Sequence, residues 1–370
     1  MKAYVLNGIN QLDYMEVEKP KLQSGWVLVE VGAAGICESD IPRIFKTGTY
    51  HFPTIPGHEF AGKVVEVVDK EAEHWLGKRV GVFPLIPCKE CFVCVDEKYE
   101  MCRNYDYLGS RRDGGFTEYV AVPIWNLIEL PEEMPMEAAA MLEPASVARH
   151  AVTRLQITSE DTVALFGLGT IGIIITQWLH IMGVKKVYAI GHHPEHGEAM
   201  KQAASEEYEY FNDVRDTVEQ SEHERADDAK ETFVNATDWL MNRTDGKGVT
   251  IAIDCVGSSE VLSACLNCVR PGGQVLSVGN PRGDMELEKA VYWKILRNQI
   301  RLIGTWNSSF THAQEDDWHQ VIQATCEGRL KLSELITHRL PFEELEKGLL
   351  IARDKTEYRN KMMILRTEIN

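Results

Sequence analysis

Four cysteines within fifteen residues constrain this chain more than any other feature of its sequence. They are spaced C-x2-C-x2-C-x7-C inside the loop-like stretch PLIPCKECFVCVDEKYEMC, at Cys88, Cys91, Cys94 and Cys102. A short loop can close four thiolates around one tetrahedral Zn²⁺, with metal–sulfur bonds of about 2.3 Å. Because four thiolates leave no open coordination position, the predicted zinc is structural and takes no part in chemistry.

Two other interpretations of these cysteines are open at the level of sequence. A [4Fe–4S] cluster can also use a C-x2-C-x2-C run, but the bacterial ferredoxin run has its fourth cysteine within a few residues and a proline after it. Cys102 meets neither condition. The four thiols could also be unrelated core residues. The spacing favours zinc.

Length and charge exclude several classes of protein. A chain of 370 residues predicts two domains. The formal net charge of −17 argues against nucleic-acid or anionic-membrane partners, because both would repel the protein. The sequence contains no run of eighteen apolar residues, so it predicts no membrane span. The N-terminal residues lack a signal-peptide pattern. Nine cysteines, five of them in predicted metal positions, suit a reducing cytoplasm.

The pattern of apolar residues changes along the chain. Up to about residue 120 it predicts short β segments separated by Gly and Pro, among them WVLVEVGAAGI and AGKVVEVV. From about residue 146, apolar strands such as TVALF and VTIAIDCVG alternate with helices, which is typical of a parallel sheet covered on both faces. After about residue 305 the pattern is mixed again. We therefore expect a β-rich part and an α/β part.

Two further segments carry weaker signals. Cys265 and Cys268 also have C-x2-C spacing, but they lie in a predicted helix that ends at Pro271, so we expect them to pack in a core. The acidic stretch from about Ser205 to Asp238 predicts an exposed helical excursion.

A glycine motif, Gly167, Gly169 and Gly172 in G-x-G-x-x-G, directly follows a predicted strand and opens a predicted helix. That context makes it a dinucleotide-binding fingerprint, in which the glycines allow a tight turn and a close approach of the backbone to a pyrophosphate. The helix that starts around Thr170 and Ile171 offers free N–H groups to the phosphates. Glycines needed only for a tight turn are the alternative.

The acidic residue expected about 20 residues further on is missing, because the predicted second strand ends in Gly191-His192-His193. A carboxylate at this position would bind the ribose hydroxyls and repel a 2′-phosphate. Its absence leaves both NAD(H) and NADP(H) open. His192 and its neighbour could face a 2′-phosphate, which favours NADP(H), whereas Glu195 could preserve a preference for NAD(H).

Three further short segments contain Cys37, His58 and Glu143: GICESD, PGHEFAG and LEPASVARHA. Together with the cysteine loop and the glycine motif, the order of these segments resembles the zinc-dependent medium-chain alcohol and polyol dehydrogenases over essentially the whole chain. The resemblance implies an α/β protein with an irregular, β-rich GroES-like catalytic domain and a Rossmann coenzyme-binding domain. The expected boundaries are 1–145 with 306–370 for the first, including a structural-zinc lobe at about 84–105, and 146–305 for the second.

The resemblance also assigns a second, catalytic zinc, which makes two Zn²⁺ per chain. Cys37 and His58 match the first two ligands of the family. The third ligand would be Glu143 in a Glu-Pro pair, as in the sorbitol-dehydrogenase branch. Glu59 matches a carboxylate that approaches the zinc directly or through water.

Two neighbouring residues would support this zinc. Asp40 matches the carboxylate that orients the ligand histidine, and Ser39 matches the hydroxyl that passes the alcohol proton onward. The family also implies a homodimer or homotetramer, commonly through edge pairing of Rossmann sheets.

Within the family, the segments SDIPRIFK and YDYLGSRRDGGF resemble the galactitol-1-phosphate 5-dehydrogenases. We therefore expect reversible oxidation of a secondary hydroxyl of a polyol or polyol phosphate to the ketose. Basic residues near the catalytic elements could grip a phosphate, since arginine binds phosphate bidentately. These residues are Arg43, the strongest candidate, and Lys46, Arg111 and Arg112. Surface salt bridges or contacts with the cofactor pyrophosphate are the alternative.

Two other functions are compatible with parts of this pattern. A threonine or simple-alcohol dehydrogenase would keep the fold and change the substrate. A non-catalytic zinc-ribbon binding protein would use the cysteine loop for partner recognition, bind one zinc and have no affinity for a nucleotide. The glycine motif and the acidic charge argue against the second.

Overall fold

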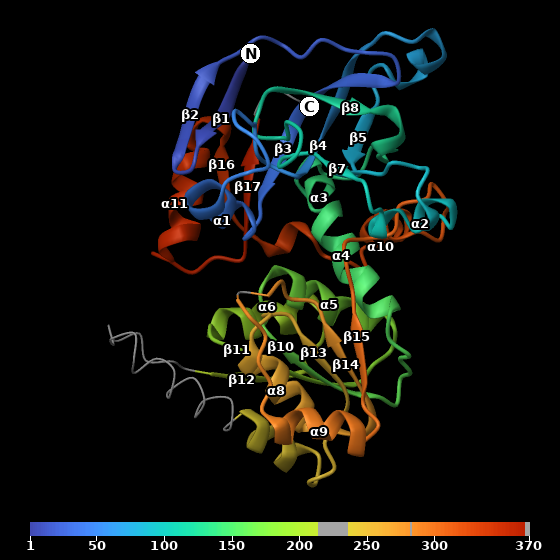
Figure 1. Cartoon of the computed structure of the whole chain (residues 1–370), viewed down its shortest axis with the longest axis vertical. Helices are drawn as coiled ribbons and strands as arrows, with labels where there is room; N and C mark the ends of the chain where they lie inside the picture. Colours follow the sequence, from blue (N-terminus) through green and yellow to red (C-terminus); the bar gives the residue numbers. More distant parts are fainter. Residues whose placement is uncertain (214–235, 282, 367–370) are drawn as a thin grey trace. The chain divides into compact units, whose positions relative to one another are not determined.

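The computed structural model describes residues 1–213, 236–281 and 283–366. The chain forms two compact units, Met1–Ser146 with Asn307–Asn370 and Val147–Trp306 (Figure 1). Residues 214–235 of the predicted acidic excursion lie outside the described residues. Among the helices of the described part, none has the length and apolar character needed to cross a membrane.

The first unit is built on a seven-stranded sheet in the order β16-β17-β3-β4-β5-β9, with β8 also paired to β3. Its strands are β3 (Trp26–Ile36), β4 (Glu59–Val67), β5 (Arg79–Val82), β8 (Tyr119–Pro123), β9 (Leu127–Glu129), β16 (Ile336–Pro341) and β17 (Lys361–Leu365). A hairpin of β1 (Lys2–Gly8) and β2 (Gln11–Glu16) and a short pair of β6 (Leu85–Ile86) and β7 (Asp106–Tyr107) complete its β structure. The predicted segment WVLVEVGAAGI is β3, so the expected β-rich part is confirmed.

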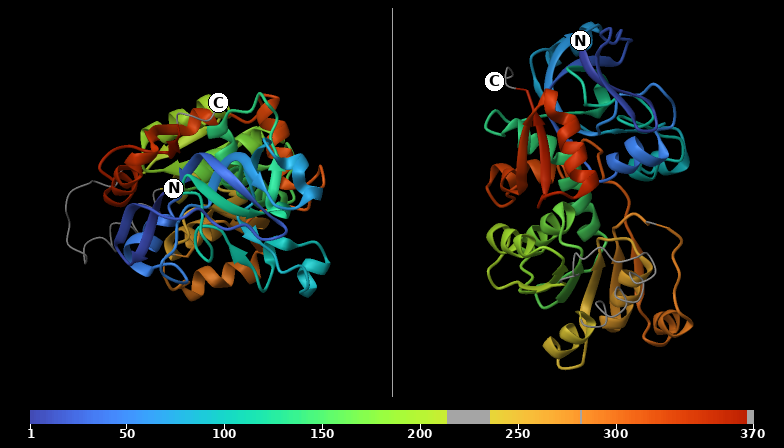
Figure 2. Two further views of the ribbon diagram at one scale, coloured as in Figure 1. Left: turned by 90° about the horizontal axis from the view of Figure 1, so that it is seen from above. Right: turned by 90° about the vertical axis from the view of Figure 1, so that its left-hand side faces the viewer.

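The end of the chain lies in this first unit. β17 pairs antiparallel with β3, with Met362 opposite Ile36, and β3 pairs antiparallel with β4, with Gly35 opposite Glu59. Figure 2 shows the C-terminal strands, in red, beside the N-terminal ones, in blue. Residues more than 300 positions apart in sequence therefore meet where β3 ends and β4 begins.

Short helices and loops surround the sheet. They are α1 (Asp40–Pro42), α2 (Phe92–Val95), α3 (Met136–Ala140), α10 (Asp317–Cys326) and α11 (Leu345–Asp354), and α4 (Leu142–Thr153) follows α3 along the chain. Apolar side chains from alternate strand positions, such as Val27, Val29 and Val31, form the buried core together with Phe60 and Phe116. Of the catalytic candidates, Cys37 and Ser39 lie just after β3, His58 and Glu59 at the start of β4, Asp40 in α1 and Glu143 in α4.

The second unit is a six-stranded parallel sheet in the order β12-β11-β10-β13-β14-β15. The strands are β10 (Thr162–Phe166), β11 (Lys186–Gly191), β12 (Glu209–Asn212), β13 (Val249–Asp254), β14 (Val269–Ser277) and β15 (Arg301–Gly304), and the helices are α5 (Thr170–Ile181), α6 (Pro194–Ala203), α8 (Ser259–Cys268) and α9 (Lys289–Arg297). Counted from β10, this is the 3-2-1-4-5-6 order of dinucleotide-binding sheets. The expected α/β class with a Rossmann unit is confirmed. Cys265 and Cys268 are fully buried, as expected of core thiols.

The glycine motif connects β10 to α5. Gly167 has a φ of +93°, a conformation that L side chains rarely adopt. A Cβ on Gly172 would lie 2.2 Å from the carbonyl oxygen of Gly167, so α5 can begin against this turn only with glycine at that position. The predicted strand–turn–helix context of the motif is confirmed.

Candidate functional site

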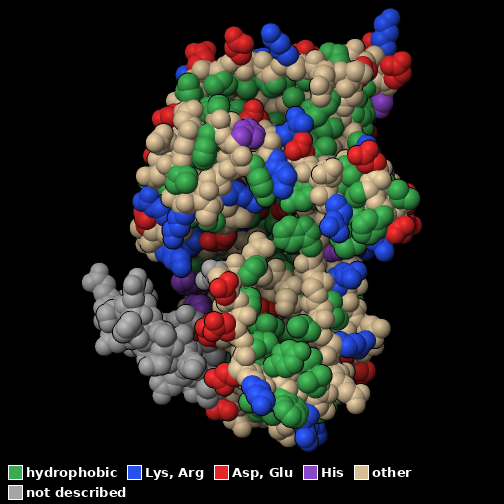
Figure 3. Space-filling model, in the orientation of Figure 1, with side chains coloured by type: hydrophobic (Ala, Val, Ile, Leu, Met, Phe, Trp, Pro, Cys, Tyr) green, Lys and Arg blue, Asp and Glu red, His purple; other side chains and the backbone are tan. Residues whose placement is uncertain are grey.

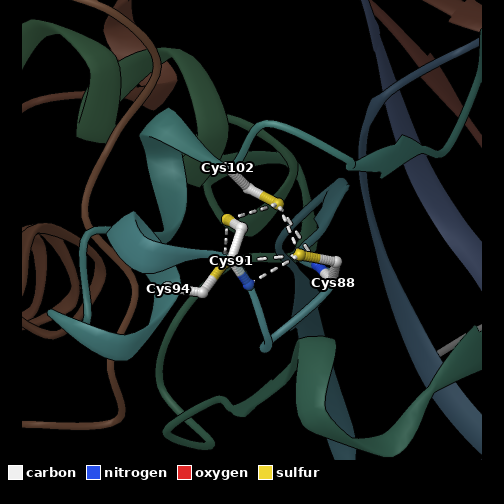
Figure 4. A group of neighbouring side chains, drawn as sticks. All are labelled: Cys88, Cys91, Cys94 and Cys102. Carbon is white, nitrogen blue, oxygen red and sulfur yellow. Dashed lines mark hydrogen bonds between the residues drawn. The ribbon is translucent and has the colours of Figure 1, made fainter.

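The four cysteines of the 88–102 loop converge on one point (Figure 4). The Sγ atoms of Cys91 and Cys94 lie 3.5 Å apart, as do those of Cys88 and Cys102, and two further pairs lie 4.0 Å apart. Backbone N–H groups donate to two of the sulfurs, from Cys91 to Cys88 and from Cys88 and Asn104 to Cys102. Such bonds orient the two sulfurs toward the centre of the group.

This geometry fits a single tetrahedral ion. With bonds of about 2.3 Å to zinc, four sulfurs at the corners of a tetrahedron are about 3.8 Å apart. The observed separations of 3.5–4.0 Å bracket that value. A [4Fe–4S] cluster binds each thiolate to a different iron atom, so its ligands must stand further apart than ligands of one ion. The donor set therefore suits zinc.

A second group of possible ligands forms where β3 ends and β4 begins. Cys37 follows the last residue of β3, His58 precedes β4, and Glu59 is the first residue of β4. One ligand atom from each lies within 4.8 Å of the others. His58 and Glu59 are buried and Cys37 is partly exposed. Thiolate, imidazole and carboxylate form the mixed donor set of a catalytic zinc site, which keeps one coordination position open.

The residues that follow Cys37 turn toward this group. Asp40 is fully buried, and its Oδ1 lies 3.3 Å from Nδ1 of His58 while its Oδ2 accepts the N–H of Cys37. Burial alone would raise the pKa of Asp40, but the charge and hydrogen bond of His58, with the charge of Arg43 and the Cys37 N–H, together hold that pKa below its usual value. A carboxylate at Nδ1 favours a proton there and leaves Nε2 free for a metal. Ser39 Oγ donates to Cys37 Sγ at 3.2 Å.

Lys361, which no sequence signal indicated, completes the group from β17. The residue is 3% exposed, and its Nζ donates to Glu59 Oε2 at 2.5 Å and to the Ile36 carbonyl at 3.2 Å. Burial alone would lower the pKa of Lys361, but the Glu59 carboxylate raises it above its usual value. Lys361 therefore stays charged and fixes the Glu59 side chain. A lone lysine at the start of a C-terminal strand offers no local pattern from which this contact could be predicted.

Glu143 is held by a second residue that the sequence did not single out. Tyr107 Oη donates to Glu143 Oε1 at 3.3 Å, and the Tyr107 ring lies 5.9 Å from that of His58. Burial raises the pKa of Glu143 to about 7, although the charge of His58 acts in the opposite direction. Glu143 is not in the described group whose ligand atoms all lie within 4.8 Å of one another. Its assignment as third ligand stays a prediction.

The four predicted basic residues have different surroundings. An Arg43 guanidinium nitrogen lies 3.7 Å from Asp40 Oδ1 and 3.4 Å from Nδ1 of His58. Arg112 donates to Asp106 Oδ2 at 2.7 Å, which is a surface salt bridge. Lys46 is exposed. Arg111 lies over the rings of Tyr50 and Tyr105.

The cofactor candidates surround the β10–α5 turn and the end of β11. A Cβ on Gly169 would meet no atom within 4 Å, so open space lies over the backbone that would carry the pyrophosphate. At Gly191 a Cβ would meet Tyr210 Oη at 2.9 Å. An acidic side chain at the end of β11 would therefore collide with Tyr210, which explains the glycine at this position. His192 Nδ1 lies 2.9 Å from the carbonyl oxygen of Asp213 and 3.6 Å from its carboxylate.

Comparison with known proteins gives matches over both units. Residues 23–132 match the family described as the alcohol dehydrogenase GroES-like domain, and residues 170–326 match the family described as zinc-binding dehydrogenase. Galactitol 1-phosphate 5-dehydrogenase of Escherichia coli K12 is 31% identical over 323 residues, 87% of this chain and 88% of the relative. The crystal structure of galactitol-1-phosphate dehydrogenase from Escherichia coli superposes with a TM-score of 0.80 and 30% identity, covering 99% of this chain and all of that one.

Two further similar proteins are dehydrogenases named for substrates other than galactitol 1-phosphate. Erythritol/L-threitol dehydrogenase of Mycolicibacterium smegmatis is 28% identical over 374 residues, 96% of this chain and 95% of the relative. An alcohol dehydrogenase of Escherichia coli CFT073, crystallised with the cofactor NADH, has a TM-score of 0.83 at 25% identity and covers 99% of both chains.

Proposed function

Since the chain belongs to the zinc-dependent medium-chain alcohol and polyol dehydrogenases, we propose that it oxidises a secondary hydroxyl of a polyol or polyol phosphate to the ketose, reversibly, with NAD(P). The observation that carries this proposal is the mixed group of Cys37, His58 and Glu59. A cytoplasmic location, expected from the cysteine usage, is part of the proposal.

The residues around this group would hold a zinc ion and fix its ligands, so that the hydroxyl of an alcohol substrate can bind it. Cys37 and His58 would hold a catalytic zinc together with Glu59 or Glu143 as the carboxylate ligand. Zinc, when bound, supplies a Lewis acid that lowers the pKa of a coordinated hydroxyl. Asp40 keeps the proton of His58 on Nδ1, and Lys361 restrains the Glu59 carboxylate.

Proton transfer is assigned to Ser39. Its Oγ lies 3.2 Å from Cys37 Sγ, and the side chain is partly exposed. A hydroxyl in this position can accept the substrate proton and release its own to solvent. The nicotinamide, when bound, supplies the hydride acceptor, and the turn at Gly167 with the first residues of α5 would bind its pyrophosphate.

Turnover with a substrate panel tests the proposed function. We expect NAD(P)-dependent oxidation of polyols or polyol phosphates, and lower kcat/KM for L-threonine and for ethanol. A preference for threonine or ethanol would instead identify the alternative dehydrogenases of the same fold. A protein that binds one zinc and no nucleotide would contradict the dehydrogenase proposal altogether.

For the cofactor we propose a preference for NADP(H). The support is the absence of an acid at Gly191 and the position of His192, whose Nδ1 lies 3.6 Å from the Asp213 carboxylate. A histidine, unlike an acid, does not repel a 2′-phosphate, and a ring N–H can donate a hydrogen bond to one. We expect His192→Ala to lower kcat/KM for NADP about 10- to 100-fold while changing that for NAD little.

The measurement is the ratio of kcat/KM for the two cofactors at one saturating polyol. His180→Ala, at an exposed histidine of α5, is the matched control and should keep the wild-type ratio. Gly191→Asp is a poorer test, since its side chain would displace Tyr210. A wild-type enzyme that strongly prefers NAD would contradict this proposal.

For the assembly we propose a homodimer or homotetramer formed through β15. Within the described residues this edge strand pairs with β14 alone, and its Leu302 is 47% exposed. Hydrophobic side chains gather on the face of this unit that carries α9, where Trp293 and Leu296 are exposed (Figure 3). An unpaired edge with exposed apolar residues can pair with a second copy.

Light scattering should therefore give a multiple of the 41.9 kDa chain mass. We expect Leu302→Arg to reduce the assembly to a smaller species, because a charge would be buried in the new sheet. Leu76→Arg, at an exposed leucine of the first unit, should leave the mass unchanged. A monomeric wild type would rule out the assembly.

A further inference from the structure

The loop of residues 109–116, which contains Arg111, packs directly against residues 55–57, the segment immediately before His58. The N–H groups of Gly114, Gly115 and Phe116 donate to the carbonyl oxygens of residues 55–57, at 2.7–3.0 Å. In return, the N–H of Ile55 donates to Asp113 Oδ1 at 2.9 Å. The loop from residue 109 to 116 therefore has a fixed position relative to the candidate catalytic group.

Arg111 in this loop lies over the rings of two tyrosines. Its Cζ is 4.0 Å from the ring centre of Tyr50 and 4.6 Å from that of Tyr105. Its backbone is also held, since its N–H donates to the Tyr107 carbonyl at 2.9 Å and its carbonyl lies 3.0 Å from Nε2 of His51. Cation–π contacts hold a guanidinium in place without neutralising its charge.

No carboxylate among the described residues pairs with this guanidinium, and its buried Nε has no hydrogen-bond partner there. The nearby acids are otherwise engaged: Asp106 accepts from Arg112, and Asp113 accepts from Ile55. Arg43, by contrast, already lies 3.7 Å from the buried Asp40 carboxylate. Of the three predicted arginines, Arg111 is thus the one with no carboxylate partner among the described residues.

A series of ring contacts links this arginine to the catalytic group. Tyr105 lies 6.3 Å from Tyr107, centre to centre, and Tyr107 lies 5.9 Å from His58. Tyr105, which lies under Arg111, is therefore linked through Tyr107 to His58, a candidate metal ligand. A molecule that contacts both Arg111 and the catalytic group needs a carbon chain between its reacting hydroxyl and its anionic group. A polyol phosphate has this form.

We infer that Arg111, held between Tyr50 and Tyr105, binds the phosphate of a polyol phosphate whose secondary hydroxyl lies at the Cys37–His58–Glu59 group. This inference rests on the proposed function and selects the phosphorylated substrate class. The guanidinium grips the phosphate bidentately, and the rigid tyrosine support lowers the entropy lost on binding. Tyr50 is 67% exposed, so the site opens to solvent.

The test compares galactitol 1-phosphate with galactitol, a pair that differs only in the phosphate. We expect the wild type to prefer the phosphate ester, and Arg111→Ala to lower kcat/KM for it about 10- to 100-fold. The kcat/KM for galactitol should stay within about twofold. Arg111→Lys should recover only part of the loss, since an ammonium cannot bind phosphate bidentately.

Two measurements separate this role from a structural one. Calorimetry should show that galactitol 1-phosphate binds more tightly than galactitol, and that Arg111→Ala removes the difference while the zinc content is unchanged. Arg353→Ala is the control, since Arg353 also lies over an aromatic ring, Phe45, but is already paired with Asp354. It should behave as the wild type.

Different results would overturn the two proposals. Equal binding of the two ligands by the wild type, or equal losses for both substrates in Arg111→Ala, would refute the phosphate site. In that case, turnover of galactitol would leave the dehydrogenase proposal intact. If calorimetry shows the Arg111-dependent preference but no polyol or polyol phosphate is oxidised with either cofactor, the proposed function fails and the phosphate site stands.

Discussion

Replacing His58 by alanine is expected to remove one of two zinc ions per chain and to lower kcat/KM by at least about a thousandfold. Lewis-acid stabilisation by a metal contributes several kcal/mol, and each 1.36 kcal/mol corresponds to a factor of ten in rate. Without the imidazole, only Cys37 and carboxylates remain, which is too few neutral and soft donors for a stable zinc site. Metal analysis of the purified variant and steady-state kinetics measure the two effects.

The control for this prediction is an exposed histidine of the same unit. His74 lies in the 3-10 helix Lys70–Trp75, with its Nδ1 3.0 Å from the Glu71 carbonyl, and belongs to neither described metal group. His74→Ala should keep both zinc ions and wild-type activity. A His58→Ala protein with two zinc ions, or with wild-type turnover, would show that the second group is not the catalytic metal site.

The parts of this site that sequence predicted well are those whose residues are close along the chain. Cys88 and Cys102 are separated by only fourteen positions, so a single loop decides whether their sulfurs can meet. The glycine motif is likewise local, because its turn and helix are consecutive. Spacing then carries most of the geometry, and the structure places both motifs in the expected context.

The parts that could not be predicted depend on the register of distant strands. Lys361 reaches Glu59 because β17 pairs with β3 and β3 with β4, and no nearby residues encode that pairing. Tyr107 contacts Glu143 through a similar long-range approach. The same limit applies to Arg43 and Arg111: both are basic residues near catalytic motifs, and only their partners distinguish them.

Replacing Cys94 by serine is expected to remove the other zinc and to destabilise the first unit without removing the catalytic group. Cys94 is the buried thiol on α2, and its sulfur lies 3.5 Å from that of Cys91. Zinc binding by four thiolates is coupled to folding, so an incomplete set loses both the ion and the order that it imposes. A unit of this size loses about 2–4 °C in Tm for each kcal/mol. We expect a fall of about 10 °C or more.

Cys326→Ser separates this effect from the general loss of a thiol. Cys326 is the exposed cysteine at the end of α10 and belongs to neither described metal group. Its replacement should keep two zinc ions and the wild-type Tm, whereas Cys94→Ser should keep one. The remaining ion in Cys94→Ser should be released by a further His58→Ala change, since the two groups share no ligand. A Cys94→Ser protein with two zinc ions and an unchanged Tm would show that the cysteine loop holds no structural zinc.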